Sequence, residues 1–260
     1  MIRGIYAIMV LDLKRVWIDR VRIITGIVQP LLYLFVLGAG LGGNVRSGGA
    51  DFQRFIYPGV LGLSLLFSAV FAAIIIVFDR QVGFFKAVLV SPLPRPAIAF
   101  GKIASGAAQA LIQGVILLPF APLVGVHFGL LSFFEMLGAM VLGAVAFSAM
   151  GVAAASRFTS TTVFPVISNA LLLPMFFMAG ALYPLRNAPH WMQVATRFDP
   201  VAYAVDLMRG AVLGQYYFPP WQSVLVLFGL VAVLGWMSVG VFNRGEDDSI
   251  LGETKIKWRR

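Results

Sequence analysis

The chain has 260 residues, of which 60% are hydrophobic and only 12% are charged. A soluble domain is about half apolar and about a quarter charged, so this composition excludes an ordinary soluble protein and indicates one that uses lipid as solvent. Cysteine is absent, which excludes disulfides, thiolate metal sites and cysteine nucleophiles. The net charge of +9 indicates basic loops that face anionic lipid, and no basic stripe with interleaved aromatic residues points to nucleic acid as a partner.

Residues 1–22 are predicted to form an amphipathic helix at the membrane interface. Apolar residues share one helical face, and charged residues fall on the opposite face. The apolar set is Ile2, Ile5, Tyr6, Met9, Leu13, Val16 and Trp17, and the charged set is Asp12, Arg15, Asp19 and Arg22. The segment carries too many charges to span a bilayer. The alternative is a soluble cap without membrane contact.

Six apolar stretches that follow are long enough to cross a bilayer, which takes about 20 residues. They predict an all-α membrane protein with transmembrane helices at 23–41, 57–78, 98–124, 130–155, 163–183 and 221–242. Small residues crowd the fourth stretch and predict a helix that packs closely inside the bundle. They are Gly138, Ala139, Gly143, Ala144, Ala146, Ala149 and Gly151.

The distribution of Lys and Arg predicts the orientation. With the N-terminus inside, fifteen of the twenty basic residues lie on the inner side and five on the outer side. This excess agrees with the positive-inside rule, so both termini, including the tail at 243–260, are predicted to be cytoplasmic. The long connection between the fifth and sixth stretches then lies outside.

That outer connection is predicted to be a structured cap. The stretch 177–210 is moderately apolar and broken by prolines, and it contains amphipathic pieces at 191–198 and 201–213. Asp206 and Arg209 are three residues apart on the second piece, where they could form an ion pair or lie hydrated at the surface.

The cytoplasmic loop at 79–95 contains a second amphipathic segment. Phe84, Phe85, Val88 and Leu89 share one helical face, and Ser91-Pro92 ends the helix. Such a helix can lie on lipid or dock into a groove of a partner, and periodicity favours neither.

Several local patterns do not support a site. The G-x-G-x-x-G match at 38–43 ends a predicted span and has no βαβ context, and Gly101-Lys102 lacks the first glycine and the Ser or Thr of a phosphate loop. His127 and His190 are too isolated to predict a metal site or a triad. Glu135 is either a functional carboxylate in the membrane or a hydrated one at its surface.

The outer connection at 177–210 and the cytoplasmic loop at 79–95 resemble those of the ABC-2 type permeases, the membrane subunits of type V ABC exporters. The resemblance is strongest to the daunorubicin-resistance and nodulation-factor export permeases. The outer signature of that family is matched by Phe177-Met178-Ala179-Gly180, Pro184, Pro189-His190-Trp191, Asp199-Pro200-Val201-Ala202-Tyr203 and Arg209. The coupling-helix signature is matched by Asp79, Gly83, Phe84, Val88-Leu89, Ser91-Pro92 and Arg95, with departures at Gln81 and Phe85.

The resemblance implies one transmembrane domain over 1–260, with an interfacial helix at 1–22, a coupling loop at 79–95, and an outer cap of two short re-entrant helices at 184–220. It implies that an ATPase subunit is contacted by Asp79, Arg80, Gly83, Phe84, Phe85, Val88, Leu89, Pro92 and Arg95. It implies an outer gate formed by Phe177, Gly180, Pro184, Pro189, Trp191, Asp199, Pro200, Tyr203 and Arg209.

The chain is therefore expected to be a transport subunit of the bacterial inner membrane and not itself an enzyme. The resemblance implies that ATP and magnesium bind to a separate ATPase, that two permease copies form a homodimer, and that the cargo is amphipathic, lipid-linked or drug-like. The alternative is a secondary transporter or channel, which usually shows inverted repeats or buried ionisable residues. A membrane enzyme would need clustered catalytic or metal-binding residues, which the sequence does not show.

Overall fold

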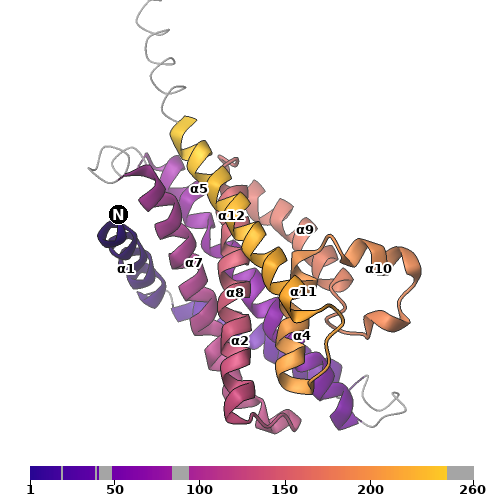
Figure 1. Cartoon of the computed structure of the whole chain (residues 1–260). Helices are drawn as coiled ribbons and strands as arrows, with labels where there is room; N and C mark the ends of the chain where they lie inside the picture. Colours follow the sequence, from indigo (N-terminus) through magenta and orange to yellow (C-terminus); the bar gives the residue numbers. More distant parts are fainter. Residues whose placement is uncertain (19, 39, 41–48, 84–93, 245–260) are drawn as a thin grey trace, which may run out of the picture.

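A computed structural model describes residues 1–18, 20–38, 40, 49–83 and 94–244, and this part of the chain is helical without strands (Figure 1). Predictions for Asp19, most of the glycine-rich segment 38–43, residues 84–93 and the tail beyond 244 lie outside it. The longer helices are α1 (Ile2–Ile18), α2 (Arg20–Leu32), α4 (Gly49–Ala72), α5 (Ile74–Gln81), α7 (Arg95–Leu117), α8 (Leu130–Ala155), α9 (Val163–Met178), α10 (His190–Thr196), α11 (Pro200–Leu213) and α12 (Pro220–Arg244). Short turns are η1 (Tyr33–Leu37), η2 (Leu118–Phe120), η3 (Pro122–Val124) and η4 (Leu185–Asn187).

Four helices of the described chain are long and apolar enough to cross a membrane. They are Phe52–Gln81, Arg95–Phe120, Leu130–Ala155 and Pro220–Gly240. The first and fifth predicted spans are shorter apolar helices, Ile24–Leu37 and Val163–Met178. At 1.5 Å per residue the second of these covers about 24 Å, against roughly 30 Å for the hydrocarbon core. The prediction of six full-length spans is therefore met by four in the described residues.

The α4 helix lies at the centre of the bundle and packs against α7, α8 and α11. Small residues permit these close approaches: a Cβ added to Gly151 of α8 would lie 2.8 Å from the Cα of Val70. Ala144, Ala146 and Ala149 of α8 are fully buried. The close packing predicted from the small residues of this helix is found at these positions, whereas Gly138 of the same set is exposed.

The α1 helix packs along α7, and its orientation differs from a simple reading of the amphipathic pattern. Ile2 and Tyr6 on the predicted apolar face point away from the protein and are 83% and 63% exposed. Ile8 is buried beside Gly101 of α7, and the charged side chain of Asp12 is buried as well. The charged face thus meets the bundle, because α7 supplies an opposite charge there.

The connection between α9 and α12, predicted to lie outside and called the outer cap below, contains two helices that differ in burial. The α11 helix is inserted into the bundle, where it packs on α4, α8 and α12 and most of its side chains are buried. The α10 helix projects from the side of the bundle (Figure 1). In the same view the N-terminus, α5 and the end of α12 lie in the upper half, whereas α4 begins at the bottom.

Candidate functional site

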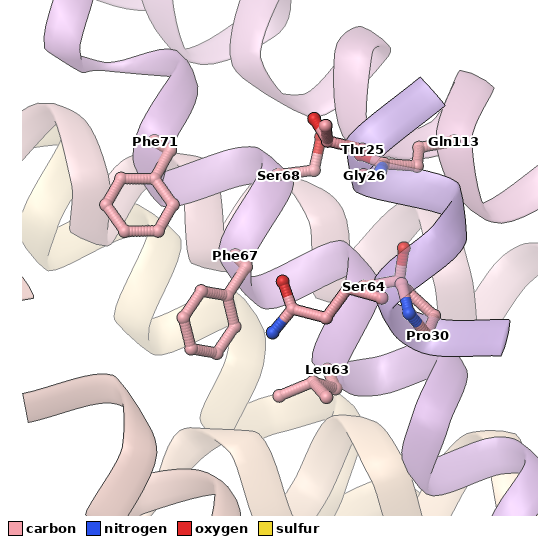
Figure 2. A pocket seen from close by; sticks show the side chains of 10 residues that line it. Thr25, Gly26, Pro30, Leu63, Ser64, Phe67, Ser68, Phe71 and Gln113 are labelled. Carbon is pink, nitrogen blue, oxygen red and sulfur yellow. The ribbon is translucent and has the colours of Figure 1, made fainter. Parts of the chain in front are cut away.

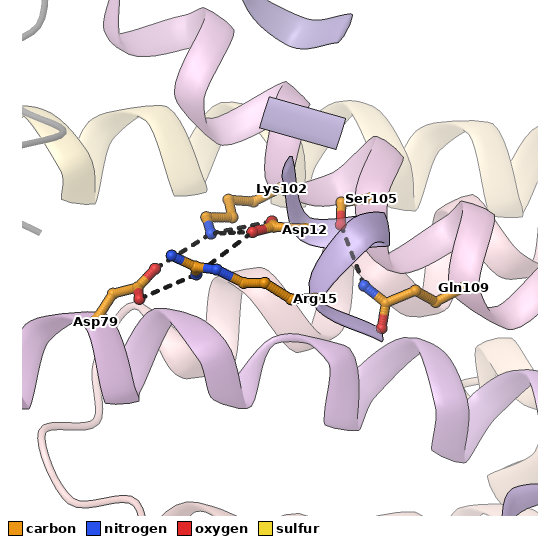
Figure 3. Close-up of polar contacts among 6 residues, drawn as sticks. All are labelled: Asp12, Arg15, Asp79, Lys102, Ser105 and Gln109. Carbon is orange, nitrogen blue, oxygen red and sulfur yellow. Dashed lines mark hydrogen bonds and ion pairs between the residues drawn. The ribbon is translucent and has the colours of Figure 1, made fainter. Parts of the chain in front are cut away.

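Four ionisable side chains from three separate segments meet where α5 ends (Figure 3). Lys102 Nζ donates to both carboxylate oxygens of Asp12, at 3.1 and 3.0 Å, and to Oδ2 of Asp79 at 3.4 Å. Arg15 Nη1 donates to Oδ1 of Asp79 at 3.3 Å. We call Asp12, Arg15, Asp79 and Lys102 the charge cluster. It joins α1, α5 and α7 through side chains up to 90 residues apart in sequence.

Three of the four side chains in the charge cluster are buried. Asp12, Asp79 and Lys102 are 1%, 3% and 8% exposed, and two carboxylates balance two cations. A buried charge is tolerated only when it is paired and hydrogen-bonded, so each member depends on the other three. The predicted coupling residue Asp79 therefore faces inward to α1 and α7.

The two residues after Asp79 tie the end of α5 to the next pair of helices. Arg80 Nη1 donates to the backbone oxygen of Ser156, directly after α8, at 2.6 Å. Thr161 Oγ1, in the connection to α9, donates to Oε1 of Gln81 at 2.9 Å. Movement of the start of the coupling loop would therefore act on α1, α7 and α8 together.

The described ends of the coupling loop are Gly83 and Arg95. Gly83 has a φ of +74°, a left-handed conformation that favours glycine, and Arg95 begins α7. The predicted contact face lies outside the described residues and comprises Phe84, Phe85, Val88, Leu89 and Pro92. Its role as an ATPase contact stays a prediction.

Arg209 is the central anchor of the outer cap. It is 6% exposed, and its Nη2 donates to the backbone oxygens of Gly180 at 2.8 Å and Ala181 at 3.4 Å. The guanidinium also lies 4.2 Å from the ring centroid of Phe55 on α4. Burial lowers the pKa of Arg209 to about 10, which still leaves it protonated at neutral pH. Arg209, in the C-terminal half of α11, therefore joins the turn after α9 to Phe55 of α4.

Two glycines permit the turn after α9 to pack closely against α4. Gly180 has a φ of +67°, and a Cβ at this position would collide with the side chain of Leu185. A Cβ on Gly59 of α4 would collide with the backbone oxygen of Ala181. The turn and α4 thus approach each other at a distance that only glycine permits.

Asp206 closes the other end of the cap. Its Oδ1 accepts from the backbone N–H of Tyr217 at 2.8 Å, and its Oδ2 accepts from that of Phe218 at 3.0 Å. The side chain is 2% exposed, and burial raises its pKa, which the two N–H donors oppose. The hydrated surface pair considered for Asp206 and Arg209 is therefore wrong, because both side chains are buried and bind backbone groups.

Asp199 begins α11 as its N-cap and accepts from the backbone N–H of Val201 at 2.9 Å. Pro200 takes the first helical position, where its missing N–H costs nothing. The other carboxylate oxygen of Asp199 is buried without a hydrogen-bond partner among the described residues. Burial accordingly raises the pKa of Asp199 to about 7.

The stability of the outer cap is expected to depend on pH through Asp199. Its folded pKa lies above the ordinary 3.8, so its contribution is complete below about pH 4 and is lost as pH rises through about 7. Between pH 5 and 8 we expect a loss on the order of 2 kcal/mol, measured as a falling melting temperature of the purified protein. Asp199→Asn should flatten most of this slope. Glu135→Gln, at an exposed position, should leave it unchanged.

The predicted gate residues divide into two groups. Gly180, Asp199, Tyr203 and Arg209 are buried, and Pro200 at the start of α11 is half-buried. Arg209 bonds to Gly180, whereas the hydroxyl of Tyr203 donates to the backbone oxygen of Arg197 at 2.8 Å. The others lie on the surface of the cap and are Phe177, Pro184, Pro189 and Trp191. The structure thus provides a buried anchor and an exposed rim.

Sequence reasoning missed three members of the charge cluster, namely Asp12, Arg15 and Lys102. The signal was present in Lys102, which lies four positions inside the predicted span at 98–124. An ionisable residue inside a span requires a partner, and asking which carboxylate served it would have pointed to Asp12 or Asp79.

Comparison with known proteins identifies the family to which the chain is similar. The family model described as ABC-2 type transporter matches residues 3–213, which include the charge cluster, both ends of the coupling loop and the cap through α11. Nodulation protein J of Rhizobium leguminosarum bv. trifolii is 30% identical over 219 residues, 83% of each chain. The putative transport permease ycf38 of Cyanophora paradoxa is 28% identical over 75% of this chain and 71% of its own length.

A further relative is the probable doxorubicin resistance ABC transporter permease protein DrrC of Mycobacterium tuberculosis, 26% identical over 80% of this chain and 76% of its own. The family match covers well over half of the chain, and the helical bundle has helices able to cross a membrane. The chain therefore belongs to the ABC-2 type transporter family and is a membrane permease subunit of an ABC exporter.

Proposed function

We propose that this permease moves an amphipathic, lipid-linked or drug-like molecule out of the cytoplasm or the inner leaflet of a bacterial inner membrane. Two copies of the chain pair as a homodimer and work with a separate ATPase subunit that binds ATP and magnesium. The DrrC relative, named as a probable doxorubicin resistance permease, supports a drug-like or amphipathic cargo.

The proposed topology has six crossings with both termini in the cytoplasm. The two shorter apolar helices, Ile24–Leu37 and Val163–Met178, then cross where the bilayer thins locally or their flanking residues reach to its surface. The placement of the N-terminus and the end of α12 in the same half of the bundle supports an even number of crossings (Figure 1).

The charge cluster is the observation that best supports energy coupling at the 79–95 loop. A partner that moves this loop pulls on Asp79, and through Lys102, Arg15 and Arg80 the displacement reaches α7, α1 and the end of α8. The continuous path along α5 and α4 leads on to Phe55 and Gly59, beneath the outer cap. In this proposal ATPase closure enters at one end of the central helix, and the gate around Arg209 opens at the other.

Co-purification and transport test the proposal together. The chain, expressed with the ATPase subunit of its exporter, should co-purify with it and drive ATP-dependent uptake of doxorubicin, a fluorescent amphipath, into inside-out vesicles. Uptake that continues after ATP depletion, with no ATPase subunit bound, would favour the secondary transporter or channel instead.

Phe84→Asp is expected to uncouple the exporter without removing the permease from the membrane. A carboxylate on the docking face would be buried against the ATPase unpaired, and such a charge costs several kcal/mol, weakening the complex by about a hundredfold or more. The measurement is co-purification of the ATPase and ATP-driven uptake in vesicles. Phe84→Leu, which keeps the face apolar, is the matched control and should retain both. Normal assembly of the Asp variant would refute the docking role.

A further inference from the structure

A polar chamber opens between α2, α4 and α7, on the central helix between the outer cap and the charge cluster (Figure 2). Its volume is about 210 Å³. Ten residues line it: Thr25, Gly26, Gln29, Pro30, Leu63, Ser64, Phe67, Ser68, Phe71 and Gln113. None of the ten is charged, and five carry hydroxyl or amide groups.

The chamber lies deep in the membrane-spanning region. Its α4 residues run from 63 to 71, in the middle of the apolar helix Phe52–Gln81. Water is scarce at this depth, so polar groups are kept there only where they meet a partner or line a cavity. A hydroxyl or amide at mid-span is therefore costly unless it finds a partner in the protein or in a bound molecule.

The Ser64 hydroxyl has no such partner within the described chain. Ser64 is 4% exposed, and its Oγ is buried without a hydrogen bond. A buried hydroxyl that makes no hydrogen bond destabilises the folded protein. Because Ser64 lines the chamber, a rotation of its side chain would let a ligand hydroxyl or amide placed there satisfy the Oγ.

Gly26 and Gln113 form the wall on the α2 and α7 side (Figure 2). A Cβ on Gly26 would collide with Nε2 of Gln113, so the glycine leaves room for this amide beside the chamber. Opposite them, Phe67 and Phe71 form a tilted pair with ring centroids 5.7 Å apart. The chamber thus offers glutamine amides from α2 and α7, and both hydroxyl groups and aromatic rings from α4.

An apolar groove continues from the chamber along α2 and η1. It has a volume of about 650 Å³ and shares Thr25 and Gln29 with the chamber. Its remaining lining is Val28, Leu32, Tyr33, Val36 and Leu37. Leu32 and Val36 are 57% and 62% exposed, so the groove is open at the surface of the protein. The π-helical turn η1, a form common at functional sites, forms part of its wall.

We propose that chamber and groove together bind one amphipathic molecule whose uncharged head carries hydroxyl or amide groups. The head occupies the chamber, where it hydrogen-bonds Ser64 and the glutamine amides, and an alkyl chain lies in the groove beside α2. The uncharged lining disfavours a phosphate or carboxylate head, since such a charge would be buried without a counter-ion. Taking this molecule as the exported cargo rests on the proposed function, whereas its binding does not.

The test uses the full chain in phosphatidylcholine nanodiscs, without ATPase or ATP, and an alkyl glucoside with a photoreactive diazirine on its chain. We expect saturable labelling within residues 28–37, which competes with dodecyl maltoside and not with dodecyl sulfate. Ser64→Ala should weaken binding about fivefold to tenfold, the effect of one lost hydrogen bond.

Ser223→Ala is the matched control. Ser223 on α12 is fully buried, its hydroxyl also lacks a partner within the described residues, and it does not line the chamber. Both variants remove an unsatisfied hydroxyl and should unfold at or above the wild-type temperature, but only Ser64→Ala should change binding. A second pair of variants is Gly26→Val, which fills the chamber and should weaken binding, and Gly138→Val, where a Cβ meets open space and binding should not change.

Three results would overturn the proposal: labelling that does not saturate, equal competition by dodecyl sulfate, or equal binding by the two serine variants. Cross-links from the groove to a second copy of the chain would assign it to the dimer interface instead. Transport separates this inference from the proposed function. Saturable binding without ATP-driven uptake of the glucoside would leave the groove intact and refute only its role in export of this molecule, whereas uptake unaffected by Gly26→Val would refute the groove alone.

Discussion

Lys102→Met is expected to abolish export and to lower the stability of the permease by about 3–5 kcal/mol, the usual cost of breaking a buried ion pair. The substitution leaves the carboxylates of Asp12 and Asp79 without the ammonium group that they share. Thermal unfolding of the purified protein, followed by tryptophan fluorescence, measures the loss of stability. ATP-driven uptake in vesicles measures the loss of export.

Two further variants separate charge from packing. Adding Asp12→Asn to Lys102→Met returns the cluster to one carboxylate and one cation, so part of the lost stability should be recovered in the double-mutant cycle. Lys14→Met removes a lysine from an exposed position on the same helix as Asp12 and should be neutral. If Lys102→Met and Lys14→Met behaved alike, the charge cluster would have no structural role.

Arg209→Met is expected to loosen the outer cap and to cost about 2–4 kcal/mol, because charge-assisted hydrogen bonds to two backbone oxygens and the contact with the Phe55 ring are lost together. The turn at Gly180 should then become accessible to proteases added from the outer side. Limited proteolysis mapped by mass spectrometry, beside the melting temperature, provides the measurement.

The control for this cap variant is Arg197→Met, which removes an arginine side chain from an exposed position on the same cap. The Tyr203 hydroxyl donates to the backbone oxygen of Arg197, which the substitution leaves in place. Equal cleavage of the two variants would show that the anchor lies elsewhere. A selective effect of Arg209→Met on export, with the melting temperature unchanged, would indicate a role in gating alone.

Features that arise within one helix or one motif were predictable from the sequence. The small residues of α8 indicated close packing, and Ala144, Ala146 and Ala149 are fully buried. Gly180 and Arg209 were singled out through a resemblance, and their contact follows the order of that motif. Gly83 at the start of the coupling loop has the left-handed φ that favours glycine.

Features that depend on distant partners were not predictable. Which side of α1 meets the bundle is decided by Lys102, about 90 residues further along, and hydrophobic periodicity carries no information about that choice. Asp206 binds the backbone of Tyr217 and Phe218 after the helix has ended, so a rule for residues three or four apart could not find it. The shorter α9 reflects a turn at Gly180 that hydropathy averages over.

The charge cluster also bears on the order in which the chain is assembled during synthesis. Asp12 and Arg15 leave the ribosome first, and at 3.8 Å they can pair with each other but not yet with Asp79 or Lys102. Because burial of the Asp12 carboxylate needs the ammonium group of Lys102, we expect α1 to dock on the bundle only after α7 has been made. The N-terminal helix, made first, is therefore among the last elements of this end of the bundle to reach its final position.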